Sequence, residues 1–432
     1  MPQETPSERI EQHVGRLRGQ HRRIGDLNPR FFAFSHVAPW DEDEALRQAS
    51  LGGPLSGLSV SVKGNIPIKG LAYTEGSRLF DGRLADHDAD VVSLARAAGG
   101  YIHGATTLSE LAMYGVRNAY ETMGLNPWNV ERTAGGSSTG AGVAASLDLA
   151  DINIGTDGGG SIRNPAIHCG AVGFMPSAGA ISAEGKTRYS RSVESIGLVA
   201  RSVDLVSRAF RVLGKAKQPE GAARRRLLVP MKFIETMSDA ATLAIFKEDV
   251  ERLAGAGFEL VHEEVEGWQA ADRAAGVASL AEAGDVLALM DLSTAGEGIR
   301  RRYEAFTKLT AENLEQAGRD RQAFRAAISD GLRRSGASAV LTPGWPFAAP
   351  PIDAETIELN GRRVPLDPHR NCFVRPANAI NASAITIPTD LYSDEHVPAS
   401  VQILAPQGDD LHALELASAV EQQLYRLPKL VV

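Results

Sequence analysis

Short apolar runs alternate with segments of helical periodicity along most of this chain, and this alternation constrains the fold more than any other feature. Helical spacing is found in residues 7–22, 89–99, 138–149, 239–254, 269–290, 304–333 and 409–425. Strand-like runs lie at residues 58–62, 101–105, 151–154, 227–230, 339–343, 384–388 and 399–406. This order is typical of α/β proteins. We therefore predict an α/β fold with a large mixed, mostly parallel central sheet covered by helices on both faces.

The 432 residues contain no tract rich in proline, serine or glycine that would mark a linker, and no internal repeat. We therefore expect a single domain over residues 1–432. Residues 215–335 are more helical and more charged than their flanks. For this reason we expect them to form a helical lobe within that domain.

Charge and composition exclude several classes of function. The chain has 45 basic and 53 acidic residues, so its net charge of −8 gives no attraction for nucleic acid. The N-terminal residues lack the apolar core of a signal peptide, and no run of about 18 apolar residues occurs. We expect a cytoplasmic protein without membrane association. Two cysteines, Cys169 and Cys372, and ten scattered histidines indicate neither a disulfide framework nor a metal site.

Two glycine-rich stretches contain the candidate catalytic residues: TAGGSSTGAG at residues 133–142 and GTDGGGSIRNP at residues 155–165. Glycine-dense loops bind phosphate, allow close packing, or direct backbone N–H groups at a developing negative charge. Neither stretch has the GK[ST] of a P-loop, which disfavours phosphate binding. No serine has the GxSxG context of an α/β-hydrolase with a matching histidine. A serine nucleophile therefore needs a base from elsewhere in the chain.

Lys63 is the candidate base. It follows the apolar run of residues 58–62, whose alternation predicts a half-buried strand. Burial lowers the pKa of a lysine because desolvation disfavours the ammonium form, and the neutral amine can then accept a proton. A surface lysine at a strand end is the alternative.

The order of these motifs resembles the amidase signature family of serine amidohydrolases. The resemblance is dense over residues 50–205 and is carried by GPLSGLSVSVKGNI, TEGS, HDADVV, NPWN, RTAGGSS, GTDGGGSIRNPA and SIGLVARSV. That family uses a Ser-cisSer-Lys triad. By this resemblance Lys63 is the base, Ser137 is the middle serine after a cis peptide bond, and Ser161 is the nucleophile.

The resemblance also implies roles for the residues around the triad. The oxyanion hole would be formed by the backbone N–H groups of Gly158, Gly159, Gly160 and Ser161. Ser138 would orient the lysine by a hydrogen bond, or else cap the helix that follows. For Asp157 and Arg163 we expect a structural ion pair or hydrogen bonds within the loop rather than contact with substrate. The chain departs from the family pattern at Gly64, Ala105, Ala134 and residues 174–177, which leaves the triad intact and the substrate range open.

The resemblance implies an amidohydrolase. It would cleave the C–N bond of a small soluble carboxamide or ureido-type compound through an acyl-enzyme and release ammonia or an amine, without cofactor or metal. Arg375, Arg188 and Arg191 are candidate partners for an acidic substrate, with a surface position as the alternative for each. Two other functions stay open: an amidase-fold subunit of a glutamine-dependent amidotransferase, and a non-catalytic scaffold. Besides the small-molecule amide substrate, a homodimer or a small accessory subunit is compatible with the sequence.

Overall fold

The computed structural model describes residues 5–113, 117–120, 122–215, 221 and 223–430. Its strands are β1 (Phe34–Val37), β2 (Ser59–Lys63), β3 (Tyr101–Thr106), β4 (Ile152–Asp157), β5 (Val172–Met175), β6 (Ser195–Ala200), β7 (Arg226–Val229), β8 (Glu259–His262), β9 (Ala339–Pro343), β10 (Thr356–Leu359), β11 (Arg362–Pro365), β12 (Ser383–Tyr392) and β13 (Val397–Ala405). Its α-helices are α1 (Pro6–Phe31), α2 (Glu42–Ser50), α3 (Asp90–Ala97), α4 (Thr139–Ser146), α5 (Arg163–Cys169), α6 (Val203–Leu213), α7 (Met231–Met237), α8 (Ala240–Gly255), α9 (Trp268–Leu287), α10 (Glu297–Phe306), α11 (Ala311–Ser335), α12 (Arg375–Ala379) and α13 (Asp410–Leu424). Short 3-10 helices are η1 (Arg78–Phe80), η2 (Glu110–Ala112) and η3 (Leu292–Thr294).

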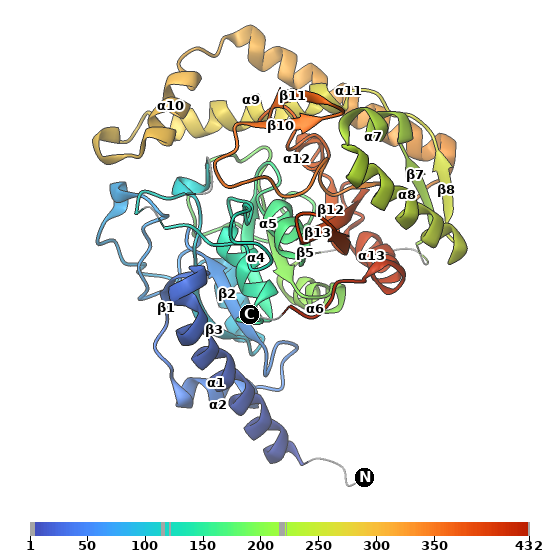
Figure 1. Cartoon of the computed structure of the whole chain (residues 1–432). Coiled ribbons are helices and arrows are strands. Elements are labelled where there is room, and N and C mark those ends of the chain that lie inside the picture. Colours follow the sequence, from blue (N-terminus) through green and yellow to red (C-terminus); the bar gives the residue numbers. More distant parts are fainter. Residues whose placement is uncertain (1–4, 114–116, 121, 216–220, 222, 431–432) are drawn as a thin grey trace.

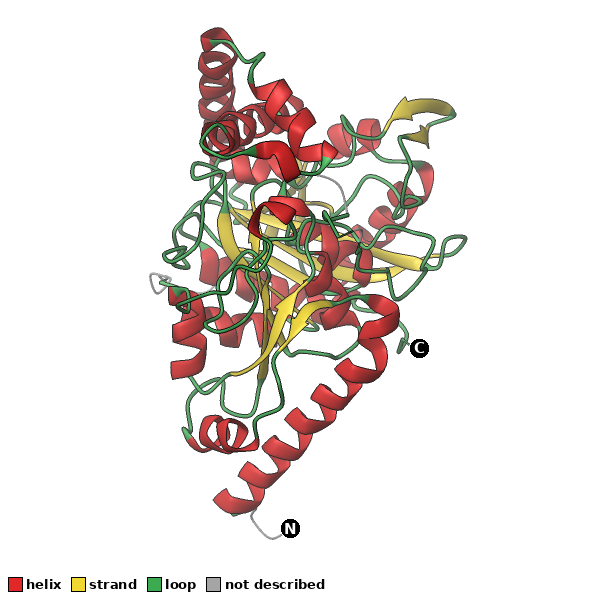
Figure 2. Ribbon diagram, turned by 90° about the vertical axis from the view of Figure 1, so that its left-hand side faces the viewer, coloured by secondary structure: helices red, strands yellow, loops and turns green. Residues whose placement is uncertain are grey.

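An 11-stranded sheet in the order β1-β3-β2-β4-β6-β5-β12-β13-β9-β7-β8 forms the centre of the protein. Helices cover both of its faces (Figures 1 and 2). The predicted α/β fold with a large mixed sheet is therefore confirmed. Parallel pairing does not predominate, however, because only β2–β3, β2–β4, β7–β8 and β7–β9 are parallel, whereas the other six neighbouring pairs are antiparallel. A separate two-stranded sheet joins β10 and β11.

Strand β2 is buried along its whole length, and not on one face only as its alternating sequence predicts. The polar positions of this strand are satisfied inside the protein. The Ser59 hydroxyl donates to Asp151 at 3.0 Å, and the Ser61 hydroxyl donates to Asn153 at 2.5 Å. Because these hydroxyls have internal partners, their burial carries no uncompensated desolvation cost. The strand can therefore lie between β3 and β4 in the middle of the sheet.

Residues 215–335 combine two kinds of structure. Strands β7 and β8 extend the main sheet at one edge. Helices α9, α10 and α11 lie along the upper side of the molecule in Figure 1, where α9 packs against α10, α11 and α12. The single-domain organisation and the helical lobe within it remain predictions.

The helix predicted over residues 304–333 is in fact two helices, α10 and α11. Thr310 begins the second helix with a capping box: its hydroxyl accepts from the N–H of Asn313, whose side chain accepts from the N–H of Thr310. Threonine is one of the residues preferred at the N-cap position, so Thr310 is a helix-start signal. Because helical periodicity continues across this boundary, the sequence predicts one helix here instead of two.

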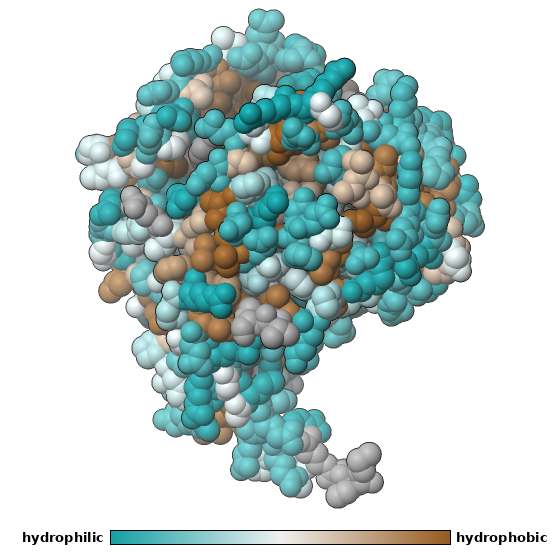
Figure 3. Space-filling view, in the orientation of Figure 1, coloured by the Kyte–Doolittle hydropathy of each residue, from teal (hydrophilic) through white to brown (hydrophobic). Residues whose placement is uncertain are grey.

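The visible surface in Figure 3 is covered mainly by hydrophilic residues, with hydrophobic ones in the recesses between them. Among the described residues, none of the helices combines the length and the apolar character needed to span a bilayer.

Candidate active site

The site lies where two parallel strands end. β2 and β4 are parallel neighbours, with Val62 opposite Ile154, so their carboxyl ends meet at the same edge of the sheet. Lys63 is the last residue of β2, and Thr156 is the penultimate residue of β4. Ligand sites in α/β proteins commonly lie just beyond the carboxyl ends of parallel strands. The glycine-rich segments that precede α4 and α5 come to the same edge.

Lys63 is fully buried, which excludes the alternative of a surface lysine. Its Nζ donates to Ser137 Oγ at 2.7 Å and to Thr156 Oγ1 at 2.9 Å, and it lies 3.4 Å from the Thr156 carbonyl oxygen. Sequence reasoning did not single out Thr156. The only feature of the sequence that points to Thr156 is its position in the GTD motif, next to the end of β4.

Burial lowers the pKa of Lys63 from 10.5 to about 7. Glu194 and Asp157 oppose this shift because their negative charges favour the ammonium form, and Lys186 reinforces it. Lys186 and Glu194 form an ion pair of their own, with 2.6 Å between Nζ and Oε1. Lys63 is thus a lysine that carries no charge in a large fraction of molecules at neutral pH.

Ser137 lies in the loop before α4, and the peptide bond between Gly136 and Ser137 is cis, as expected. Ser137 and Ser161 both line one cavity. The two loops are joined through their backbones, since Ser138 N donates to Ser161 O at 3.0 Å. Within the described part of the chain, no hydrogen bond joins the Ser161 hydroxyl to Ser137 or to Lys63.

Among the described hydrogen bonds, none joins Ser138 to Lys63. It occupies the N-cap position of α4 but makes no side-chain cap bond. Its hydroxyl donates instead to the Thr156 carbonyl oxygen at 3.2 Å. That same carbonyl lies 3.4 Å from Lys63 Nζ, so Ser138 and Lys63 share Thr156 as a neighbour.

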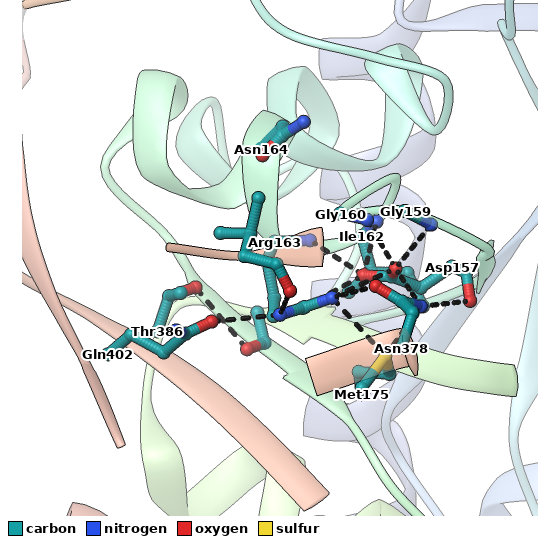
Figure 4. A network of polar contacts seen from close by, with 12 residues as sticks. Asp157, Gly159, Gly160, Ile162, Arg163, Asn164, Met175, Asn378, Thr386 and Gln402 are labelled. Carbon is teal, nitrogen blue, oxygen red and sulfur yellow. Dashed lines mark hydrogen bonds and ion pairs between the residues drawn. The ribbon is translucent and has the colours of Figure 1, made fainter. Parts of the chain in front are cut away.

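The carboxylate of Asp157 organises the second glycine loop (Figure 4). It accepts from Gly160 N at 2.6 Å, from Gly159 N at 3.2 Å and from Ile162 N at 3.1 Å. Two of the four N–H groups predicted for the oxyanion hole are therefore engaged by a carboxylate. The described hydrogen bonds leave the N–H groups of Gly158 and Ser161 for a ligand.

Asp157 and Arg163 form the expected structural ion pair. Both side chains are fully buried, and Arg163 Nε lies 3.1 Å from Asp157 Oδ2. Arg163 also donates to Gln402 at 2.8 Å and to Asn378 at 2.7 Å. Burial alone would raise the pKa of Asp157, but the Arg163 guanidinium and the hydrogen bonds from Asn378 and Gly160 lower it to about 2. The carboxylate is therefore charged at neutral pH and holds the loop in place.

Asn378 and Gln402 are site residues that the sequence did not indicate. Asn378 Nδ2 donates to Asp157 Oδ1 at 3.0 Å and to the Asp157 carbonyl oxygen at 3.1 Å. They belong to α12 and β13, more than 200 positions beyond the glycine loop they support. No local pattern connects segments so distant in the chain.

A cavity of about 1170 Å³ opens beside the two serines. Its walls combine the glycine loop with residues of α9, α10 and the segment that leads into α12. Of the arginines considered for an acidic substrate, Arg375 lines this cavity. Arg188 instead donates to the carbonyl oxygen of Arg191, at 3.1 Å. Cys169 and Cys372 are both buried free thiols.

The comparisons with known proteins identify the family of this α/β protein. The family model described as Amidase matches residues 22–414. The chain therefore belongs to the amidase signature family.

Its relatives include a Glutamyl-tRNA(Gln) amidotransferase subunit from Thermus thermophilus, 30% identical over 454 residues that cover 94% of this chain and 92% of that protein. The protein of the same name from Methylacidiphilum infernorum is 36% identical over 184 residues, and this match spans 42% of the chain and only 37% of that relative. Among solved structures, one described as "Crystal structure of amidase" has a TM-score of 0.88 and 26% identity, and covers 96% of this chain and 98% of that one.

Proposed function

We propose that this protein is an amidohydrolase in which Ser161 is the nucleophile, Ser137 relays protons and Lys63 is the base. One observation carries the proposal: a fully buried lysine amine lies 2.7 Å from the hydroxyl of Ser137. A base with a pKa near the working pH is the one that transfers protons most effectively. With its pKa lowered to about 7, Lys63 meets this condition.

The first half of the reaction forms an acyl-enzyme. Ser161 Oγ attacks the amide carbonyl carbon, its proton passes to Ser137, and the proton of Ser137 passes to Lys63. The carbonyl oxygen becomes an oxyanion, which the N–H groups of Gly158 and Ser161 stabilise. When the C–N bond breaks, the nitrogen takes a proton back by way of Ser137 and leaves as ammonia or an amine.

The second half returns the enzyme to its starting state. Water attacks the acyl carbon, and its proton follows the same route through Ser137 to Lys63. The bond between Ser161 Oγ and the acyl carbon then breaks, Ser161 is reprotonated, and a carboxylic acid is released. The proton transfers need only groups of this chain.

The test is ammonia release from a panel of carboxamides and ureido compounds by the purified chain. Ser161→Ala should abolish release, and Ser137→Ala should reduce it by at least about 100-fold. The exposed Ser393 provides a matched control, since Ser393→Ala should leave the rate unchanged. A fluorophosphonate probe should label the wild-type protein once and should not label Ser161→Ala. Labelling of Ser161→Ala at wild-type stoichiometry would refute the assignment of the nucleophile.

Membership of a glutamine-dependent amidotransferase complex is the second candidate function. It is supported by the names of the relatives, which are amidotransferase subunits. Glutamine distinguishes the two functions. An independent amidase should release ammonia from its own substrates as an isolated chain, whereas a member of a complex should hydrolyse glutamine at an appreciable rate only with its partners.

A further inference from the structure

Arg302 is an arginine of the cavity whose charge has no carboxylate partner among the described ion pairs. It lies on α10 and is only partly exposed. Its Nη2 donates to Ser279 Oγ at 2.9 Å, while its Nε is buried and makes no hydrogen bond in the described structure. A buried donor without a partner costs free energy, so the protein itself satisfies this guanidinium only in part.

A chain of hydroxyl groups connects Arg302 to the nucleophile loop. Ser279 Oγ lies 2.8 Å from Ser190 Oγ. A Cβ placed on Gly158 would lie 3.8 Å from Ser190 Cβ. Arg302, Ser279, Ser190, Gly158 and Ser161 all line the same cavity, so Arg302 belongs to the wall of the space in which a substrate of Ser161 would bind.

Arg375, the first residue of α12, lines the same cavity. Its side chain lies against the glycine loop, because a Cβ placed on Gly159 would be 3.4 Å from Arg375 Nε. Arg375 Nε is 3.4 Å from Asp272 Oδ1, an ion pair that balances one positive charge. The neighbouring charge of Arg302 is left unbalanced.

In the described structure no ion pair joins Arg302 to a carboxylate that lines the cavity. Glu297, Asp353 and Asp367 pair instead with Arg301, Arg117 and Arg370. Glu194 is paired with Lys186 at 2.6 Å, and Glu110 accepts from Ser77 Oγ at 2.6 Å and from Gly296 N at 3.1 Å. Burial, together with the charge of Arg375, lowers the pKa of Arg302 to about 10. An anion in the cavity beside the two guanidinium groups would relieve this repulsion.

We propose that Arg302, assisted by Arg375, binds a carboxylate on the acyl side of the substrate, so that the preferred substrates are monoamides of small dicarboxylic acids. Arginine matches a carboxylate through paired N–H donors, which fixes the orientation of the ligand as well as its charge. Arg302 is thus a residue that determines specificity. This inference rests on the proposed amidohydrolase function.

The experiment compares substrates that differ only in charge. Succinamate and malonamate carry the carboxylate, and butyramide and propionamide replace it by a methyl group. The wild-type protein should have a kcat/KM at least about 10-fold higher for the charged member of one pair, since a hydrogen bond to a charged group is worth about 10- to 100-fold. Arg302→Met should remove this preference, because kcat/KM for the charged amide should fall at least about 10-fold more than kcat/KM for the neutral amide.

The exposed Arg319 of α11 provides the control, and Arg319→Met should keep the preference for the charged amide. Equal kcat/KM for charged and neutral amides in the wild-type protein would overturn the inference, and this result does not depend on how well Arg302→Met folds. A parallel loss on both substrates in Arg302→Met would also overturn it.

A binding experiment tests the carboxylate site independently of the proposed amidohydrolase activity. Succinate should bind the Ser161→Ala variant in a calorimetric titration, and the double variant Ser161→Ala/Arg302→Met should lose at least about 10-fold in affinity. This result would support the carboxylate site even if no amide were hydrolysed. Absence of succinate and malonate binding to Ser161→Ala would refute the site, while ammonia release from neutral amides alone would leave the amidohydrolase function standing.

Discussion

Replacing Lys63 by methionine should change how the stability of the protein depends on pH. The pKa of this lysine is 10.5 in its ordinary state and about 7 in the folded protein, because the side chain is buried. Between these two values the unfolded chain holds a proton at Lys63 that the folded chain has released. The free energy of unfolding of the wild-type protein therefore rises with pH in this interval.

The size of the effect follows from the shift. Each pKa unit corresponds to 1.36 kcal/mol, so burial of the lysine costs about 5 kcal/mol well below pH 7. The cost is about 4 kcal/mol at pH 7 and about 2 kcal/mol at pH 9, and it vanishes near pH 10.5. Between pH 7 and pH 9 the wild-type protein should gain about 2 kcal/mol of stability relative to Lys63→Met.

Urea unfolding of both proteins at pH 7, 8 and 9 measures this difference. Methionine has a similar length, stays apolar and binds no proton. The hydrogen bonds that Lys63 donates to Ser137 and Thr156 are lost in the variant, which shifts its stability by about 1–3 kcal/mol with little dependence on pH in this range. Other titrating groups are common to both proteins and cancel in the comparison.

The exposed Lys308 supplies the control, because Lys308→Met should follow the wild-type pH dependence. If the stabilities of the wild-type protein and Lys63→Met run parallel from pH 7 to pH 9, Lys63 has no lowered pKa and cannot be the base.

Four further predictions concern activity and stability. First, kcat/KM should rise about tenfold per pH unit below pH 7 and level off above it as Lys63 loses its proton, and a flat profile from pH 5 to 9 would contradict this role. Second, Thr156→Val removes an acceptor 2.9 Å from Lys63 Nζ, so the inflection of that profile should move to lower pH, and an unmoved inflection would show that the contact is irrelevant. Third, Arg163→Met leaves Asp157 buried without its partner and should lower the free energy of unfolding by about 3–5 kcal/mol in a urea titration, whereas a change under 1 kcal/mol would mean that the pair is dispensable. Fourth, Gly160→Ala places a Cβ 2.8 Å from Val374 Cγ2 at a φ of +106°, so activity should fall by about 100-fold while the circular dichroism spectrum is retained, and wild-type turnover would disprove the need for glycine there.

Local features of the sequence indicated most of the elements and the position of the candidate site. The end of the strand at Lys63 and the glycine loops before α4 and α5 are local properties, because periodicity and glycine content act over a few residues. The ion pair of Asp157 with Arg163 is also a local feature, because only six positions separate the two residues in the sequence. The break between α10 and α11 was missed although its capping signal is also local.

The sequence by itself therefore determined many of the strands and helices, the glycine loops, and which residues are candidates for chemistry. It did not indicate several other elements, among them β1, β5, β6, α6 and α12. Only the tertiary structure decided that Thr156 contacts Lys63, that Asn378 and Gln402 support Asp157, and that Arg302 faces the cavity. These contacts depend on the order of strands in the sheet and on how α9 and α10 pack beside it. Strand order and helix packing are set by pairing and burial between segments far apart in the chain, which no short stretch of sequence encodes.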